Sequence, residues 1–242
     1  MRIAVLSDIH GNLPALEAVL AAMAPYDAVW QLGDIVGYGP QPNEVIARLI
    51  DEGARGVRGN HDSAAIGMLA TEAFNDEAAA AIEWTAEQLS PVARKWLAGL
   101  PTRAEDGPFT LVHGSPRDPM WEYVYSVGVA RANMARFTTQ NCLVGHTHVP
   151  MLFRRRSDAV VEPVAPGDDD PPLALDEWRS IINPGSVGQP RDGDPRAGAM
   201  LIDDEQGTVE WRRVEYPIEP VQQLMLDAGL PLRLAARLSF GL

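Results

Sequence analysis

Apolar runs in this chain end repeatedly at short clusters of aspartate, asparagine and histidine. Several strands must bring their ends to one place if these clusters are to act together, so the pattern constrains the fold strongly. Together the clusters contain all five histidines of the 242-residue chain. They are Asp8-Ile9-His10-Gly11-Asn12, Gly33-Asp34, Gly59-Asn60-His61-Asp62, His113-Gly114 and Gly145-His146-Thr147-His148.

The first part of the chain alternates predicted strands and helices. Apolar runs at residues 2–7, 28–32 and 55–57 predict strands. Between them, apolar residues recur at helical spacing at residues 13–23 and 43–50. This alternation is typical of an α/β fold, in which functional residues lie at the carboxyl ends of strands.

The later elements follow from composition and turn signals. Residues 71–100 are rich in Ala, Glu and Leu and predict an exposed helical pair, with Pro91 opening the second helix. Residues 163–172 contain proline, glycine and three aspartates, which indicates a mobile loop or hairpin tip. Further strands are expected at 109–112, 141–144 and 151–153, and a second block of strands at 180–182, 199–202 and 209–214. We expect one domain over residues 1–242, with a C-terminal helical tail at about 221–242 broken at Gly229-Leu230-Pro231.

Composition limits the possible partners. The formal net charge of −13 argues against stable nucleic-acid binding, because neutralising a nucleic-acid backbone requires a basic surface. Arg154-Arg155-Arg156 is the one basic cluster, and we interpret it as a solvated face. An acidic protein can still bind phosphate where bound cations reverse the local charge. Cys142 is the single cysteine, which excludes a disulfide framework, and no apolar run is long enough for a membrane span, so we expect a cytoplasmic protein.

Each cluster by itself has a structural alternative. Asp8 and His10 are separated by one residue at a strand end, so both can reach one ion, but an aspartate there can also cap a helix. Asp34 can be a turn residue, although a carboxylate can also bridge two cations about 3.5–4 Å apart. Two imidazoles at His146 and His148, after a glycine, are a stronger metal signal.

Taken together and in this order, the clusters resemble the motifs of the calcineurin-like metallophosphoesterase superfamily. These motifs are Asp-x-His, Gly-Asp, Gly-Asn-His-Asp/Glu, His and Gly-His-x-His, and all five occur within residues 8–148. The segment at residues 182–191 resembles one found in small bacterial and archaeal phosphodiesterase-like members. The resemblance implies an α/β fold (α+β by some schemes), a four-layer αββα sandwich of two mixed β-sheets with a dinuclear metal site at the strand ends.

The resemblance also implies roles for the matching residues. Two divalent ions are expected, with manganese as the first choice and Fe, Zn, Ni or Co as alternatives. A hydroxide shared between the ions would attack phosphorus, His61 would protonate the leaving oxygen, and Asp62 would orient His61 and raise its pKa. By position, Asp8, His10 and His148 would hold one ion, Asn60, His113 and His146 the other, and Asp34 would bridge both.

The substrate class follows from a departure from one branch of the family. Serine/threonine protein phosphatases carry Gly-Asp-x-Val-Asp-Arg-Gly, whereas here Gly37 and Tyr38 replace the Asp-Arg pair, which disfavours a protein phosphatase. The aromatic segment at residues 117–125 favours a small or nucleotide-like phosphate ester, either a diester or a monoester. Tyr38 is a candidate for stacking on an aromatic group. The candidate substrate contacts are Asn12, Tyr38, Asn183, Ser186 and Arg191, although residues 182–191 can equally form a structural turn built by proline and glycine.

Three questions stay open at this level. The aromatic segment at residues 117–125 can form one wall of the site, or Trp121 and Tyr123 can anchor the helices of residues 71–100. A metal-binding interaction scaffold with little turnover is an alternative function, which the intact pair of His61 and Asp62 disfavours. A nuclease acting on single-stranded nucleic acid is another, which the net charge disfavours.

Overall fold

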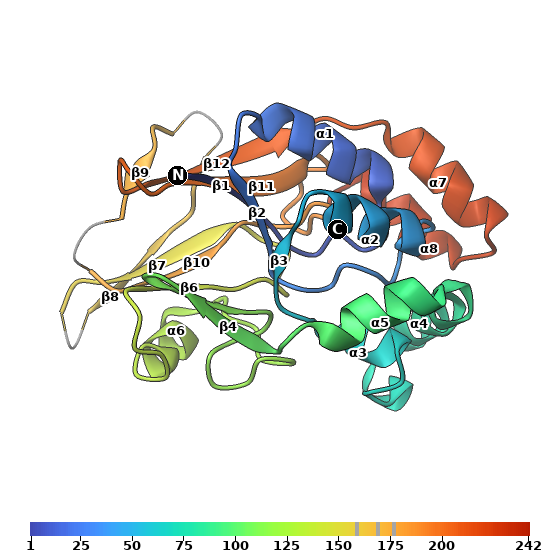
Figure 1. Cartoon of the computed structure of the whole chain (residues 1–242), viewed down its shortest axis with the longest axis horizontal. Coiled ribbons are helices and arrows are strands. Elements are labelled where there is room, and N and C mark those ends of the chain that lie inside the picture. Colours follow the sequence, from blue (N-terminus) through green and yellow to red (C-terminus); the bar gives the residue numbers. More distant parts are fainter. Residues whose placement is uncertain (158–159, 168–169, 176–177) are drawn as a thin grey trace.

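The computed structural model describes residues 1–157, 160–167, 170–175 and 178–242. Two six-stranded mixed sheets pack face to face (Figure 1). The first has the order β3 (Arg55–Gly56), β2 (Ala28–Gln31), β1 (Arg2–Leu6), β11 (Ala197–Asp203), β12 (Thr208–Val214), β9 (Leu173–Ala174). The second has the order β4 (Arg103–Asp106), β5 (Phe109–Val112), β6 (Asn141–Leu143), β10 (Ser180–Asn183), β7 (Met151–Arg155), β8 (Val161–Val164).

Helices cover the outer faces of both sheets (Figure 1). The α-helices are α1 (Leu13–Met23), α2 (Pro42–Asp51), α3 (Asn60–Ala65), α4 (Asp76–Gln88), α5 (Pro91–Gly99), α6 (Val127–Asn133), α7 (Ile218–Asp227) and α8 (Leu232–Ala236). Short 3₁₀ turns, η1 (Thr71–Ala73) and η2 (Arg237–Ser239), precede α4 and follow α8. Helices α1, α2, α7 and α8 lie on the first sheet and α6 on the second, which confirms the expected four-layer αββα sandwich.

Three apolar clusters fill the spaces between the four layers. Strand β1 alternates between two of them, because successive side chains of a strand point to opposite faces. Ala4 and Leu6 join the cluster beneath the helices, whereas Ile3 and Val5 join the cluster between the sheets. In β10, Ile182 faces the other sheet while its neighbour Ile181 faces α6. Both strands lie in the interior of their sheets and are covered on both faces.

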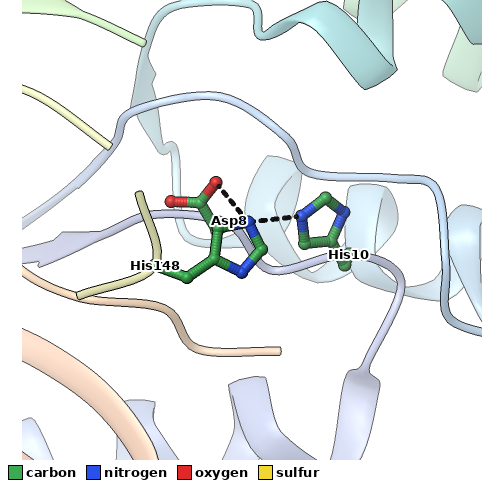
Figure 2. Close-up of side chains that lie close together, drawn as sticks. All are labelled: Asp8, His10 and His148. Carbon is green, nitrogen blue, oxygen red and sulfur yellow. Dashed lines mark hydrogen bonds and ion pairs between the residues drawn. The ribbon is translucent and has the colours of Figure 1, made fainter. Parts of the chain in front are cut away.

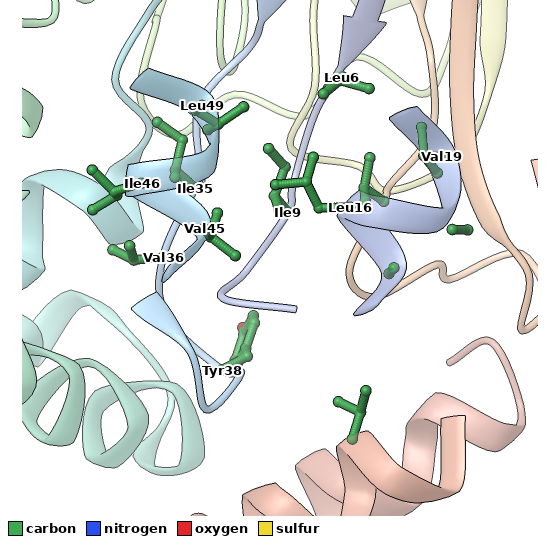
Figure 3. Packing of buried hydrophobic residues seen from close by; sticks show 14 of the residues in the cluster. Leu6, Ile9, Leu16, Val19, Ile35, Val36, Tyr38, Val45, Ile46 and Leu49 are labelled. Atoms are coloured by element: carbon green, nitrogen blue, oxygen red, sulfur yellow. The ribbon is translucent and has the colours of Figure 1, made fainter. Parts of the chain in front are cut away.

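The core beneath the helices continues to the loops that carry the polar clusters. Leu6 and Ile9 lie between α1 and α2 in Figure 3. Leu16 and Val19 approach from α1, and the apolar face of α2 approaches from the other side. Because Ile9 lies between Asp8 and His10 and is fully buried, packing fixes the backbone of this segment.

Parallel pairing brings the strand ends together. β1 pairs in parallel with β2, and β2 with β3. In the second sheet β6 pairs in parallel with both β5 and β10. The carboxyl ends of these strands therefore lie along one edge of the sandwich, where the polar clusters follow them.

Most predicted elements are confirmed, including the helical pair as α4 and α5 and the two C-terminal helices as α7 and α8. The strands expected at 199–202 and 209–214 form no separate block with 180–182, because β11 pairs with β1 while β10 joins the second sheet. The loop expected at 163–172 begins later, since Pro163 and Val164 belong to β8, and its residues 168–169 lie outside the described part of the chain. Strands β4, β8 and β9 and helices α3 and α6 were not predicted. Among the residues that the structure describes, no helix has the length and apolar character required to cross a membrane.

Candidate metal centre

The polar clusters require an unusual backbone. Six residues other than glycine have positive φ in the described part of the chain, namely Asp8, His10, Asp34, Tyr38, His146 and His148. All six lie in the clusters or beside them. An L-residue in this region costs about 1–2 kcal/mol, so the surrounding fold must compensate for the strain. Strained backbone gathered at one place indicates a functional site rather than ordinary turns.

Glycines allow the loops to approach one another closely. A Cβ at Gly59 would overlap the Asp34 carboxylate, and one at Gly145 would overlap the Ser7 hydroxyl. The motif glycines therefore have a steric reason for their positions, because any side chain there would displace the neighbouring carboxylate or hydroxyl.

Asp8, His10 and His148 form the first group of metal-ligand type (Figure 2). His10 Nε2 lies 3.3 Å from His148 Nε2, which is 3.2 Å from Asp8 Oδ1. The other ring nitrogens face backbone carbonyls: His10 Nδ1 lies 3.1 Å from Val36 O, and His148 Nδ1 lies 2.5 Å from Gln189 O. These carbonyls require a proton on each Nδ1, so both Nε2 atoms present lone pairs to each other.

Asp34, His113 and His146 form the second group. His113 Nδ1 donates to Leu32 O at 2.8 Å, so Nε2 is the atom that can bind a proton or a metal ion. That nitrogen lies 3.3 Å from Asp34 Oδ2 and 3.1 Å from both His146 Nδ1 and Asn60 Oδ1. Asp34 is also 3.8 Å from His10 Nε2, so its carboxylate lies between the two groups.

These residues fit two bound cations. Neutral imidazole lone pairs and carboxylate oxygens converge, and acceptors at such distances repel one another unless a cation lies between them. The amide oxygen of Asn60 faces only acceptors, and turning the amide so that its nitrogen donates would satisfy them in the absence of an ion. His146 Nε2 is buried with no hydrogen-bond partner. Mixed nitrogen and oxygen ligands of this kind suit divalent transition metals.

The electrostatics point the same way. Burial lowers the pKa of His113, but the charge of Asp34 and a hydrogen bond to it outweigh burial and raise this pKa to about 9. A positive charge is therefore favoured at the second group, as a proton or as a metal ion. Burial raises the pKa of Asp34, yet His113 and His61 together hold it well below its usual value, so the carboxylate stays ionised.

His61 lies on the wall of a cavity of about 210 Å³ that opens onto both groups. Its backbone N–H donates to Asp34 Oδ1 at 3.0 Å, and its ring packs at 4.5 Å from the ring of Tyr38. The ring atom Nδ1 is buried without a hydrogen-bond partner. Burial lowers the pKa of His61 to about 4 against the opposing charge of Asp34, and an anion bound in the cavity would act in the upward direction.

Asp62 contacts backbone N–H groups rather than the imidazole of His61 that the resemblance implies as its partner. Its Oδ1 accepts from the N–H groups of Ile35 and Val36 at 2.8 and 3.0 Å, and its Oδ2 accepts from Gly59 N–H at 2.9 Å. No hydrogen bond joins Asp62 to His61 in the described structure. Both residues lie in α3, and consecutive helical residues do not face each other. Asp62 therefore fastens the loop after β2 to the start of α3 instead of orienting the imidazole.

Two of the five candidate substrate contacts line the cavity, Tyr38 and Arg191. The Arg191 guanidinium lies over the Tyr38 ring, 5.7 Å from its centroid. It donates to Gln189 Oε1 at 2.9 Å, while its Nε is buried without a partner. This arginine is the one positively charged side chain among the residues that line this cavity.

The other three candidates support the metal loops instead. Asn12 caps α1 by accepting from Ala15 N–H at 3.2 Å and donates to Gly188 O at 3.1 Å. Asn183 donates to Gly145 O at 2.7 Å, and Ser186 donates to Asp8 O at 2.8 Å. None of the three lines the cavity. The alternative of a structural turn at residues 182–191 therefore describes Asn183 and Ser186 better.

The aromatic segment after His113 fulfils both of its expected roles. Trp121 and Tyr123 line the cavity. Trp121 also packs against Phe74, with ring centroids 5.0 Å apart, and thereby anchors the segment that leads into α4. Tyr123 stacks on His146 at 4.0 Å. Phe74 and Asn75 complete this wall and carry no sequence signal, because their approach to the site depends on tertiary packing.

Comparisons with known proteins agree with this geometry. The sequence model of the calcineurin-like phosphoesterase superfamily domain matches residues 1–207. A metallophosphoesterase from Sphaerobacter thermophilus has a similar crystal structure, with a TM-score of 0.92, 45% identity, and coverage of 100% of this chain and 99% of that one. An uncharacterised protein from Methanocaldococcus jannaschii is 35% identical over 99% of this chain and 98% of its own length.

The phosphodiesterase YfcE of Escherichia coli is 28% identical over 84% of this chain and 89% of its own. The match of the family to most of the chain, together with the ligand groups described above, means that the protein belongs to the calcineurin-like phosphoesterase superfamily and is a hydrolase of phosphoric esters.

Proposed function

We propose that the protein is a dinuclear-metal phosphoesterase that acts on small or nucleotide-like phosphate esters. The observation that carries this proposal is the convergence of acceptor atoms around a cavity that His61 and Arg191 also line. Metal ligands, a proton donor and an anion-binding side chain thus surround a single space. A site that only binds metal has no use for a proton donor or an anion-binding side chain.

We assign the ions to the two groups of metal-ligand type, with Asn60 added to the second. Asp8, His10 and His148 hold one, and Asn60, His113 and His146 hold the other, with Asp34 between them. When bound, two such ions supply an activated water and neutralise negative charge on the phosphate. We propose manganese as the working metal. The same ligand set also accepts Fe, Zn, Ni and Co.

His61 is placed to protonate the leaving oxygen. It lines the cavity and is held by its backbone bond to Asp34, at the Gly37 side of the site. With Asp62 occupied by backbone N–H groups, packing against Tyr38 fixes the orientation of the imidazole ring. General acid catalysis of this kind contributes about 10²- to 10⁴-fold to the rate.

Arg191 takes the place of the motif arginine of the serine/threonine protein phosphatases, which this chain lacks because Gly37 and Tyr38 replace the Asp-Arg pair. Tyr38 occupies the position of that arginine in the motif, and the Arg191 guanidinium lies against the ring of Tyr38. A guanidinium there can hold a non-bridging phosphate oxygen, since arginine and phosphate pair with matching geometry. The guanidinium is thus supplied by residues 183–196 rather than by the loop after β2.

The size of the cavity supports a small substrate. Its volume of about 210 Å³ is below the range of about 300–1,000 Å³ that is usual for drug-sized ligands. Aromatic side chains at Tyr38, Phe74 and Trp121 suit an aryl group or a base next to the phosphate. The relative named a phosphodiesterase supports diesters as the first class to examine.

Hydrolysis of bis-p-nitrophenyl phosphate and p-nitrophenyl phosphate tests the proposal. Metal-stripped protein is assayed with each divalent metal added back, with Asp34→Asn as the matched control. We expect metal-dependent cleavage, and the preferred ester separates a diesterase from a monoesterase. Cleavage of single-stranded nucleic acid that weakens as the salt concentration rises would instead indicate a nuclease. Inactivity toward all of these substrates would favour the scaffold alternative.

A further inference from the structure

No hydrogen bond between described residues fixes the rotation of the His61 imidazole. Its Nδ1 is buried without a partner, and Asp62 is occupied by backbone N–H groups. The last torsion of a histidine side chain is soft, because it joins an sp³ to an sp² carbon and has broad minima. A general acid must hold its proton within hydrogen-bonding distance of the leaving oxygen, so the rotation of this ring matters for turnover. Packing contacts must therefore set it.

Neighbouring groups enclose the His61 ring on several sides. The ring centroid of Tyr38 lies 4.5 Å away and that of His10 lies 4.9 Å away. Gly37 also approaches the ring closely, because a Cβ on this glycine would lie 2.5 Å from Nδ1 of the imidazole. Phe74 supplies a further contact, in a T-shaped arrangement with centroids 5.1 Å apart and ring planes at 75°. The imidazole is therefore held by a set of rings rather than by a carboxylate.

Phe74 differs from the other contacts because it comes from outside the metal loops. It follows η1, and its backbone N–H donates to Thr71 O at 2.9 Å. The next residue, Asn75, caps α4 by accepting from Ala78 N–H at 3.0 Å. Trp121 packs against the Phe74 ring with centroids 5.0 Å apart. The start of α4 and the aromatic segment thus hold Phe74 in place, so its ring can restrain the imidazole.

We propose that Phe74 is a positioning residue for the general acid. Its ring holds the imidazole of His61 in the rotation from which the proton passes to the leaving oxygen as the phosphorus–oxygen bond breaks. This inference rests on the proposed function, because it takes His61 as the acid. A T-shaped contact suits the task, since aromatic pairs prefer this arrangement and resist rotation away from it. Phe74 has no proton to exchange, so it acts through His61.

A direct contact with the substrate is the competing explanation, because Phe74 also lines the cavity. The two explanations differ in how they depend on the leaving group. A substrate contact changes the KM of aryl esters of similar size by similar factors. A positioning role changes kcat instead, and most strongly for the poorest leaving groups, because a good leaving group departs without a proton.

A series of para-substituted aryl phosphates of similar size tests the proposal in manganese-loaded protein. The measured quantity is the slope of log kcat against the pKa of the departing phenol. We expect a shallow slope in the wild type and a steep one in His61→Asn. Phe74→Leu keeps an apolar side chain without the ring. It should steepen the slope and lower kcat by about 10- to 100-fold for the most basic phenol, since a misplacement of about 1 Å can cost 10²-fold.

Two further variants separate the ring from other effects. Phe74→Tyr keeps the ring and should keep the wild-type slope. Phe240→Leu is the matched control, because it removes the same ring from a residue that is 63% exposed, and it should also keep the wild-type slope. Elemental analysis should find unchanged manganese in Phe74→Leu. Partial unfolding of a variant lowers kcat for all esters by the same factor and leaves the slope unaltered.

The outcomes distinguish the inference from the function on which it rests. An unchanged slope in Phe74→Leu, a change confined to KM, or loss of manganese would overturn the positioning role of Phe74. A wild-type slope in His61→Asn would reject His61 as the acid, and the inference with it. Failure of the wild type to cleave any of the aryl esters would instead reject the proposed function.

Discussion

Replacing Asp62 by asparagine distinguishes the observed role of this residue from the role that the family pattern implies. The carboxylate accepts three backbone N–H groups, from Gly59, Ile35 and Val36. Asparagine has one acceptor oxygen and directs its amide nitrogen at the remaining donor, so at least one buried N–H loses its acceptor. Such a group costs about 1–3 kcal/mol.

A second effect opposes this loss. Asp62 is fully buried, and burying a neutral amide costs less than burying a carboxylate. We expect the first effect to dominate, because three hydrogen bonds depend on this one side chain. The net expectation for Asp62→Asn is a decrease of about 1–3 kcal/mol in the free energy of unfolding.

Urea unfolding monitored by circular dichroism measures the change, at constant metal concentration and with the slope of the transition compared between proteins. Asp51→Asn is the matched control, since Asp51 is exposed at the end of α2, and it should change the stability by less than about 0.5 kcal/mol. If Asp62→Asn unfolds at the wild-type midpoint while turnover falls, Asp62 orients His61 after all. The reasoning from its backbone partners would then be refuted.

Three further predictions concern the metal groups and a salt-bridged loop. His61→Asn should keep both metals, measured by elemental analysis, and lower turnover by about 10²- to 10⁴-fold, and wild-type turnover would contradict the acid role. Asp34→Asn should reduce occupancy of both metals, whereas Asp8→Asn should affect mainly one, and equal losses in the two variants would contradict the division of ligands. Burial raises the pKa of Glu122, but bonds from Arg117 and two neutral neighbours lower it to about 2. Its stabilising contribution is therefore complete above the unfolded value of 4.5 and is lost as pH falls through about 2, so Glu122→Gln should destabilise the protein more at pH 7 than at pH 2.

The metal ligands could be predicted from sequence because each belongs to a short motif at a strand end. Parallel pairing within each sheet then brings those ends together, as with β1 beside β2 and β5 beside β6. The motif records residue types and order, and that information is sufficient for Asp34 or His113. It is insufficient for Asp62. The motif does not show that α3 begins at Asn60, so that the side chains of His61 and Asp62 point in different directions.

Long-range contacts were the other part that sequence reasoning missed. The pairing of β11 with β1 joins residues almost two hundred positions apart, with Ile3 opposite Ile202, and local periodicity has no information about it. The same holds for Val221 and Met225, whose position beside Tyr38 depends on how α7 packs. Asn183 and Ser186 were placed near the site correctly, but whether a side chain faces the cavity or a backbone carbonyl is decided by tertiary structure.

The backbone and the ligands together imply that bound metal contributes to folding stability. Five residues of the ligand set adopt left-handed backbone, and the lone pairs of His10 and His148 face each other at 3.3 Å. Both features oppose folding without cations, and an ion that binds the folded state alone stabilises it by about 2.7 kcal/mol at one hundred times its dissociation constant. Chelation should therefore lower the melting temperature measured by calorimetry, and adding manganese back should restore it. His61→Asn, which leaves the ligands intact, should show the same decrease on chelation. Equal melting temperatures with and without chelator would mean that the ligand loops are held by packing alone and that the convergent acceptors cost the fold nothing.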